Sequence, residues 1–212
     1  MNILPAELQK ILETSHVKQI PKGQILFYAD DRPLEVLIVK SGIVKIHNID
    51  NDGNEKILHL VGHLSVLPLA FFSGDNKATN WFYTTLIDCE IYTLSKQTLQ
   101  DLMESHSDVA IYLMNWFSLE VHELLVRLDS LGKTNVRDKL IAVLRFLMVR
   151  FSDKRRTGWW RVSFPVSHQL LADMIGMTRE STAMAMKELA DEKAIRNPKL
   201  TILEIRKEKL IN

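Results

Sequence analysis

The chain has 212 residues, of which 46% are hydrophobic and 25% are charged. This composition is ordinary for a soluble globular protein, and the length allows two modest domains or one large one. No uninterrupted apolar run reaches the length of a membrane span, so no membrane-spanning helix is expected. The N-terminus has no basic stretch before an apolar core, and a single cysteine, Cys89, cannot form an internal disulfide. Together these features predict a cytoplasmic protein.

The charges are divided unevenly along the chain. Residues 1–132 contain 10 Lys and Arg against 17 Asp and Glu, whereas residues 133–212 contain 17 against 9. The net charges of the two parts are therefore −7 and +8. Such a split favours a polyanion, such as a nucleic acid, as the partner of the C-terminal part. The alternative is an uneven surface that binds no partner.

The N-terminal part of the chain predicts a short helix followed by many short strands. Apolar residues recur at helical spacing in residues 1–16. From Val17 to about Leu94, short runs of alternating apolar and polar residues are separated by clusters of turn residues. Regularly spaced short strands are typical of a small all-β barrel or roll. Ser95 has the chemistry of an N-cap, so a further helix is expected to begin there.

The longest helix is expected from about Asp108 to Leu131, and Gly132 is expected to end it. Its apolar residues follow a heptad pattern, and they are Ala110, Met114, Phe117, Val121, Leu124, Leu128 and Leu131. A seam this regular favours a coiled coil between two copies of the chain. The predicted dimer interface comprises Met114 and the residues after it in that list. The alternative is that the same residues pack inside one copy.

A shorter helix follows, which Thr134 or Asn135 can cap and which continues to about Phe151. The junction at residues 132–135 is the expected boundary and hinge between domains. A strand is then expected in the run WWRVSFPV, which Pro165 interrupts.

Residues 166–195 predict two helices joined by a tight turn. Ser167 can cap the first helix, and Gly176 falls where two packed helices need the turn. Thr178 can cap the second helix, which is expected over residues 179–190. Two short strands around Asn197-Pro198 would form a basic wing beside it. A short helical hairpin with a polar N-terminal face on its second helix is what insertion into the DNA major groove requires.

The residue types on that second helix suggest what each would contact. Arg179 can pair with a guanine edge or reach a phosphate, and Glu180 can accept a hydrogen bond from cytosine. Ser181 suits either a base or a phosphate, and Met184 can make only apolar contact, for instance with a thymine methyl. Phosphates are expected to contact the helix starts capped by Ser167 and Thr178, and the side chains of His168, Gln169, Lys187 and Lys199. The alternative is a hairpin that packs without DNA.

The motif V-S-H-Q-x-L-A-D-x-x-G-x-T-R-E-S-T, followed by K-E-L and the wing, resembles the winged helix of the CRP/FNR family of regulators. The resemblance covers nearly the whole chain and implies an α+β fold. Residues 1–107 would form a β-roll (a double-stranded β-helix, or cupin-like jelly roll) with flanking helices. Residues 108–132 would be the dimerisation helix, and residues 133–212 the winged helix-turn-helix domain.

The resemblance also implies a homodimer on a pseudo-palindromic double-stranded DNA site, with RNA polymerase as a further partner if the protein activates transcription. Arg179 and Glu180 match the positions that read bases in the family. Met184 departs from the pattern, because the cyclic-AMP receptors of the family have a second arginine there. The reading of one base pair is therefore expected to differ.

Cyclic-nucleotide-binding members of the family hold the ribose with a Gly-Glu pair and the cyclic phosphate with an arginine, since a buried phosphate charge must be paired. The acidic position here falls on His63 or Pro68, and the arginine position on Lys77 or Thr79. No arginine lies between Arg32 and Arg127. Cyclic-nucleotide binding is therefore not expected.

Other sensory groups have little support in the sequence. An iron–sulfur cluster needs several cysteines, and Cys89 is more simply explained as a buried inert thiol. His59 and His63 lie in a β region without a metal-binding motif, so they are expected to be ordinary surface or hydrogen-bonded histidines, and no metal or cofactor is expected. The run containing Val66, Leu67, Leu69, Phe71, Phe72, Trp81 and Phe82 is a filled core or, as the less favoured alternative, a pocket for an unidentified small apolar effector.

No catalytic motif was found, so the chain is not expected to be an enzyme. The leading hypothesis is a sequence-specific, homodimeric, DNA-binding transcription regulator that does not depend on cyclic AMP. The competing hypothesis is a β-roll module that senses a small molecule or binds a protein, with a purely structural helical hairpin.

Overall fold

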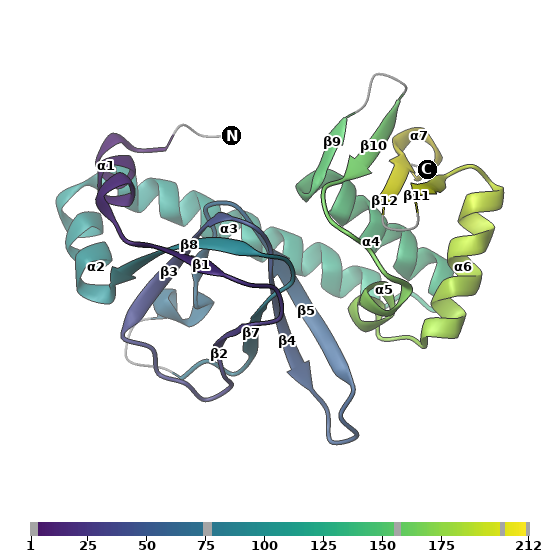
Figure 1. The fold of residues 1–212 in the computed structure, drawn as a ribbon, viewed down its shortest axis with the longest axis horizontal. Coiled ribbons are helices and arrows are strands. Elements are labelled where there is room, and N and C mark those ends of the chain that lie inside the picture. Colours follow the sequence, from purple (N-terminus) through teal and green to yellow (C-terminus); the bar gives the residue numbers. More distant parts are fainter. Residues whose placement is uncertain (1–3, 74–77, 155–157, 200–201, 211–212) are drawn as a thin grey trace. The chain divides into compact units, whose positions relative to one another are not determined.

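The computed structural model describes residues 4–73, 78–154, 158–199 and 202–210. The chain forms two compact units, Met1–His122 and Glu123–Asn212, and the division falls within the longest helix, α3 (Ser107–Leu131). Figure 1 shows the sheets of the first unit and the helices of the second. The expected α+β fold, with a β-rich N-terminal domain, a long helix and a C-terminal helix-turn-helix, is confirmed.

The described part of the first unit is a roll of two four-stranded antiparallel sheets, ordered β1-β8-β3-β6 and β2-β7-β4-β5. The strands are β1 (Val17–Ile20), β2 (Ile25–Phe27), β3 (Glu35–Ser41), β4 (Val44–Ile49), β5 (Glu55–Val61), β6 (Val66–Leu67), β7 (Phe82–Thr85) and β8 (Cys89–Ser95). The helices α1 (Ala6–Thr14) and α2 (Lys96–Ser105) flank the roll, and Ser95 caps α2 as expected, because its hydroxyl accepts the Thr98 N–H at 2.9 Å.

Strand β3 shows how the roll builds its core. Successive side chains of a strand point to opposite faces. Val36 and Ile38 pack in one cluster with apolar residues of α1, α2 and α3, whereas Leu37 and Val39 pack in another with residues of the second sheet. The first sheet therefore lies between a helical layer and the second sheet, and β3 is buried on both faces.

The turn between β3 and β4 requires glycine. Gly42 has a φ of 98°, and a Cβ atom there would lie 2.5 Å from the Cys89 sulfur and 2.6 Å from the Asp88 carbonyl oxygen. Both the backbone conformation and the close approach exclude a side chain. Cys89 itself is buried, and that burial raises the pKa of its thiol.

The apolar run after β5 largely fills the roll. Val66 and Phe71 are buried in the cluster beneath the helices, and Leu67 is buried in the cluster between the sheets. Phe71 lies in a short 3-10 helix, η1 (Leu69–Ser73), together with Phe72, whose ring packs 5.7 Å from that of Trp116 on α3. These contacts agree with the filled-core interpretation. The binding of an effector to the roll stays a prediction.

The second unit contains a trihelical core and a four-stranded antiparallel sheet ordered β11-β12-β10-β9 among its described residues. Its elements are α4 (Val136–Arg150), β9 (Ser152–Lys154), β10 (Trp159–Val162), α5 (His168–Ile175), α6 (Arg179–Asp191), β11 (Ile195–Lys199), β12 (Ile202–Arg206) and α7 (Lys207–Leu210). Asn135, rather than Thr134, caps α4 by accepting the Asp138 N–H at 2.7 Å. The run WWRVSFPV is a strand only as far as Val162.

Helix α3 has more apolar surface than packing inside one copy of the chain covers. By length and composition alone, it is the one helix among the described residues that could cross a membrane, and 17% of its most apolar stretch is buried. Its sequence nevertheless contains no long uninterrupted apolar run, because charged residues such as Glu120, Glu123 and Arg127 interrupt it. Its exposed apolar surface must therefore be explained by a partner of some kind.

His47 on β4 gives the roll a pH-dependent stability. The side chain is buried, its Nε2 atom lies 2.9 Å from the Thr84 hydroxyl, and its ring stacks on Phe82. Burial lowers the pKa of His47 below its usual 6.5; nearby Glu55 raises it and Lys45 lowers it. The unfolded chain thus binds the proton more tightly than the folded chain, and stability is lost as the pH falls below about 6.5.

We therefore expect the free energy of unfolding to fall more steeply between pH 7.5 and pH 5 in the wild type than in His47→Gln. Urea unfolding monitored by tryptophan fluorescence at each pH measures the difference. Parallel pH profiles for the two proteins would contradict the assignment to His47.

Candidate nucleic-acid interface

Each helix of the α5–α6 hairpin begins at a residue whose side chain caps it. The Ser167 hydroxyl accepts the N–H of Leu170 at 3.0 Å, and the Thr178 hydroxyl accepts the N–H of Ser181 at 3.2 Å. Each cap satisfies one of the backbone donors that a helix leaves unpaired at its first turn. Both caps were expected from the sequence, and both are present.

Gly176 makes the turn between the two helices. It has φ 64° and ψ 41°, the left-handed conformation that glycine adopts without steric cost. Its N–H and that of Met177 both point to the Ala172 carbonyl, so the end of α5 is closed by backbone hydrogen bonds. Ala172, four residues before Gly176, is fully buried.

One face of α6 is fixed in the core of the second unit. Thr182, Ala185, Met186 and Leu189 are buried, and the Thr182 hydroxyl donates to the Thr178 carbonyl at 2.9 Å. This side of α6 is therefore its inner face. Because the helix is anchored on this side, its opposite side is presented to solvent.

The opposite face of α6 carries the residues proposed to contact DNA. Arg179, Glu180 and Lys187 are exposed, and Met184 is 68% exposed. Ser181 is half-buried, and its hydroxyl lies 2.9 Å from that of Thr178. The first two turns therefore present a cation, an anion, a hydroxyl and a thioether side by side.

The C-terminal half of α6 has a different character, which sequence reasoning did not consider. Glu188 and Asp191 are exposed there, and Glu192 just beyond the helix pairs with Arg137 at 2.8 Å. Carboxylates repel phosphates, so this end of the helix is unsuited to a nucleic-acid backbone. The signal was available, since Glu188 and Asp191 follow the reading residues on the same helix.

The remaining candidate contacts lie around α5 and the wing. Ser167 and Gln169 are exposed, His168 is half-buried, and the Gln169 side chain donates to Asp173 at 2.6 Å. The side chain of Lys199 lies outside the described residues.

The wing is less basic than its sequence suggested. Arg196 on β11 pairs with the buried Glu204 on β12 at 2.7 Å, and its guanidinium lies 4.3 Å from the centre of the Trp159 ring. Arg206 lies over the same ring at 5.7 Å. These two arginines hold the wing strands to β10 through cation–π contacts.

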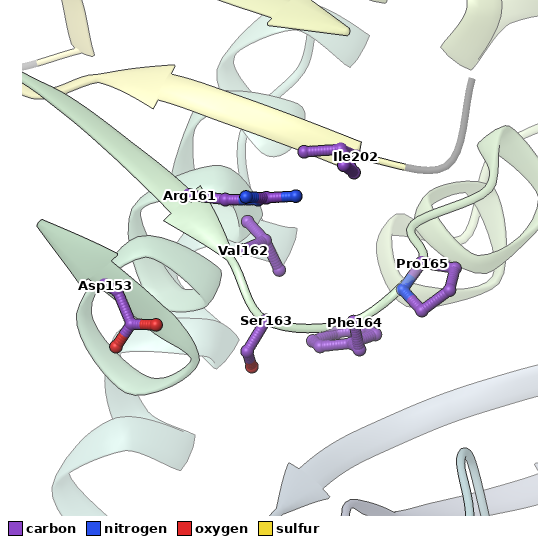
Figure 2. Close-up of a pocket in the computed structure, with 7 residues that line it drawn as sticks. All are labelled: Asp153, Arg161, Val162, Ser163, Phe164, Pro165 and Ile202. Atoms are coloured by element: carbon purple, nitrogen blue, oxygen red, sulfur yellow. The ribbon is translucent and has the colours of Figure 1, made fainter. Parts of the chain in front are cut away.

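A cavity of about 320 Å³ lies beside the wing sheet, and Figure 2 shows its lining residues, which are Asp153, Arg161, Val162, Ser163, Phe164, Pro165 and Ile202. Arg161 lies opposite Asp153 and Glu204 in the strand register, where opposite charges stabilise cross-strand pairs. None of its lining residues comes from α5 or α6, so the cavity is separate from the exposed face of the hairpin.

The two histidines that were considered as metal ligands in the roll each make a hydrogen bond. The His59 Nε2 atom lies 2.7 Å from the carboxylate of Glu120 on α3, and both side chains are buried. The exposed His63 has its Nδ1 atom 2.7 Å from the Lys40 carbonyl. Both are therefore hydrogen-bonded histidines, as expected, and they do not share a partner in these two bonds.

The positions compared with a cyclic-phosphate site are only partly described. Thr79 is buried, and its hydroxyl donates to the Tyr28 carbonyl at 2.7 Å, so it joins two loops. Pro68 is buried, and Lys77 lies outside the described residues.

The exposed apolar residues of α3 follow a line that differs in part from the predicted seam. Met114, Val121, Leu128 and Leu131 are exposed, whereas Leu124 is half-buried and Phe117 packs 5.3 Å from the ring of Phe72. Four further apolar residues of this helix are exposed outside the predicted seam, and they are Ile111, Leu119, Leu125 and Val126. Ile111 and Leu125 belong to one heptad register with Ser118 between them, and this polar residue interrupts the register in the sequence.

The turn conformation at Gly176 can be tested by substitution. Alanine in the left-handed region costs about 1 kcal/mol or slightly more, whereas asparagine tolerates that region better. We expect the free energy of unfolding to be highest for the wild type, lower for Gly176→Asn and lowest for Gly176→Ala. Urea unfolding measures the order, and an alanine variant as stable as the wild type would show that the turn is not left-handed.

Comparison with known proteins places both units. The model of a "Cyclic nucleotide-binding domain" matches residues 17–106, and that of a "Crp-like helix-turn-helix domain" matches residues 138–209. The chain is 25% identical over 202 residues to the "HTH-type transcriptional regulator ArcR" of Staphylococcus haemolyticus, covering 92% of this chain and 85% of that protein.

It is also 30% identical over 150 residues to the "Fumarate and nitrate reduction regulatory protein" of Shigella dysenteriae, covering 70% of this chain and 58% of that protein. Among solved structures, a cyclic nucleotide-binding domain containing protein from Listeria monocytogenes EGD-e has the same fold. Its TM-score is 0.80 at 17% identity, covering 97% of this chain and all of that one.

Proposed function

Because the chain belongs to the CRP/FNR family of DNA-binding transcription regulators, we propose that it binds a two-fold symmetric DNA site as a homodimer, with α6 of each copy in the major groove. The observation that carries the proposal is the anchored and capped α6, whose exposed first two turns bear Arg179, Glu180 and Met184. The family acts in transcription rather than catalysis, and a cytoplasmic location follows from that role.

The contacts divide into two classes. Arg179, Glu180, Ser181 and Met184 are proposed to read base edges, because they occupy the N-terminal face that enters a groove first in helix-turn-helix complexes. Lys187, Lys199, His168, Gln169 and the helix starts at Ser167 and Thr178 are proposed to contact phosphates. The acidic end of α6 supports this division, because it favours approach by the N-terminal end of the helix.

The dimer is proposed to form along α3. Eight large apolar residues of this helix are exposed in a single copy, and they are Ile111, Met114, Leu119, Val121, Leu125, Val126, Leu128 and Leu131. An exposed apolar surface of this extent is typical of an interface. We propose that Leu125 and Ile111 belong to it together with the exposed members of the predicted seam, whereas Phe117 contributes mainly to packing on the roll.

The roll is proposed to work without cyclic AMP, although it has the fold of a cyclic-nucleotide-binding domain. No arginine lies between Arg32 and Arg127 to pair a cyclic phosphate, and Thr79 makes a contact between loops. A small apolar effector of the roll, and contact with RNA polymerase if the protein activates transcription, are further parts of the proposal.

The reading residues can be tested with DNA sites selected from a random pool by the purified protein. We expect Arg179→Ala to weaken binding to the selected site by about 1–3 kcal/mol and to relax selectivity at one base pair. Lys187→Ala should instead weaken binding to all sequences, and it should reduce the slope of log affinity against log salt concentration by about one. Glu188→Ala, on the same helix, is the matched control and should keep the selected sequence unchanged. A protein without preference among duplexes would favour the competing module hypothesis.

The dimer can be tested by placing a charge on α3. We expect Leu128→Asp to separate the copies in sedimentation velocity and to weaken DNA binding, because a buried carboxylate must be desolvated. Val149→Asp is the control, since Val149 is 72% exposed but lies on α4. A Leu128→Asp protein that stays dimeric would refute the interface, and co-flotation of the wild type with lipid vesicles would instead indicate that a membrane covers α3.

A further inference from the structure

The last turns of α3 make a polar contact with the helix-turn-helix. The Arg127 side chain extends from α3, and its Nη2 atom donates to the carbonyl oxygen of Met174 at 2.6 Å. Burial lowers the pKa of the guanidinium to about 10, which shows how far the group is withdrawn from water while it remains charged at neutral pH. A charged group in such a place must be hydrogen-bonded, so the contact constrains both helices.

The Met174 carbonyl is a favourable hydrogen-bond acceptor for a cation. Met174 lies in the last turn of α5, where a helix has carbonyl groups without intrahelical partners and carries partial negative charge. The nearby Ala172 carbonyl is already used by the backbone of Gly176 and Met177. Arg127 therefore completes the end of α5 from another helix.

A second contact holds the same end of α3 to α4. Arg150 pairs with Glu123 at 3.3 Å, and both side chains are largely withdrawn from solvent. The buried Ser130 hydroxyl also donates to the Arg127 carbonyl at 2.6 Å, which fixes the backbone that carries the guanidinium. The C-terminal end of α3 is thus attached to α4 and α5 at defined points.

The neighbouring residue on α3 faces the other way. Leu128, next to Arg127, is 67% exposed and belongs to the proposed dimer interface. One turn of α3 therefore offers an apolar side chain to a second copy and a guanidinium to α5. From α5, only the Gly176 turn and the Thr178 cap separate this contact from α6.

We propose that Arg127 is a positioning residue that fixes the helix-turn-helix to the dimerisation helix and thereby sets the spacing between the two half-sites that the dimer accepts. This inference rests on the proposed dimeric DNA-binding function. In B-form DNA, one extra base pair turns the second half-site by about 35° and moves it by about 3.4 Å. A dimer whose reading helices are rigidly attached to the shared helix pair cannot follow that change, whereas a loosely attached one can.

The experiment compares three duplexes that carry the selected half-sites with the selected spacer, one base pair fewer and one base pair more. Affinities are measured for the wild type, Arg127→Met, Arg127→Lys and the control Arg137→Met. Arg137 lies in the same unit, but its pair with Glu192 is exposed. Binding to a single half-site and dimerisation are measured in parallel.

We expect the wild type and Arg137→Met to lose roughly tenfold or more in affinity when the spacer changes, a coupling of ordinary size between linked sites. Arg127→Met should bind all three duplexes within about threefold of one another while keeping its half-site affinity and its dimer. Arg127→Lys, which keeps the charge and a donor, should restore part of the discrimination.

The readout is a ratio within one variant, so a partial loss of folded Arg127→Met protein cancels. An Arg127→Met protein that discriminates spacers as the wild type does, or that loses half-site affinity as strongly as full-site affinity, would overturn the positioning role. If the wild type itself selects no sequence, the proposed function fails instead, and the two failures are thereby distinguished.

Discussion

The long helix α3 has apolar side chains around its whole circumference, and no single partner can bury them all. Val109 and Leu113 are buried against the roll, Trp116 and Phe117 are half-buried beside Phe72, and a further line of apolar residues faces solvent. A helix with this distribution is stable in water only when several surfaces cover it. The roll supplies one surface, the second unit takes the end of the helix, and we assign the remaining surface to a second copy.

Apolar burial brings elements together, but it does not fix their orientation, since such contacts are non-directional. On α3, two polar side chains add direction. Glu120 meets His59 of the roll, and Arg127 meets the end of α5, each through a short hydrogen bond in a buried or largely buried setting. A buried polar contact adds little net stability over a well-packed apolar one, whereas removal of one partner alone leaves the other buried and unpaired. The contacts of Glu120 and Arg127 instead select one orientation of each unit relative to the part of α3 that the unit contains.

Features encoded by neighbouring residues could be predicted from the sequence. The caps at Ser95, Ser167 and Thr178 and the turn at Gly176 depend on one or a few residues, and all were identified correctly. Strand β9 was missed, because Ser152–Lys154 is short, polar and without alternation, and it is a strand only because β10 pairs with it.

Features that join distant segments could not be predicted. Arg127 and Met174 are 47 positions apart, and His59 and Glu120 are 61 apart, so no local pattern connects them. The line of Ile111 and Leu125 escaped notice for a related reason. Ser118 interrupts their heptad register in the sequence, and only the structure shows that Phe117 packs on the roll while Ile111 and Leu125 are exposed.

The acidic end of α6 affects how quickly the protein could find its targets in a genome. Most encounters with a chromosome are with the wrong sequence, and their lifetime depends on attraction to the phosphates alone. Glu188 and Asp191 subtract from that attraction on the helix that we propose reads bases. Weaker attraction to irrelevant sequences therefore leaves a larger share of the protein free to reach its selected site.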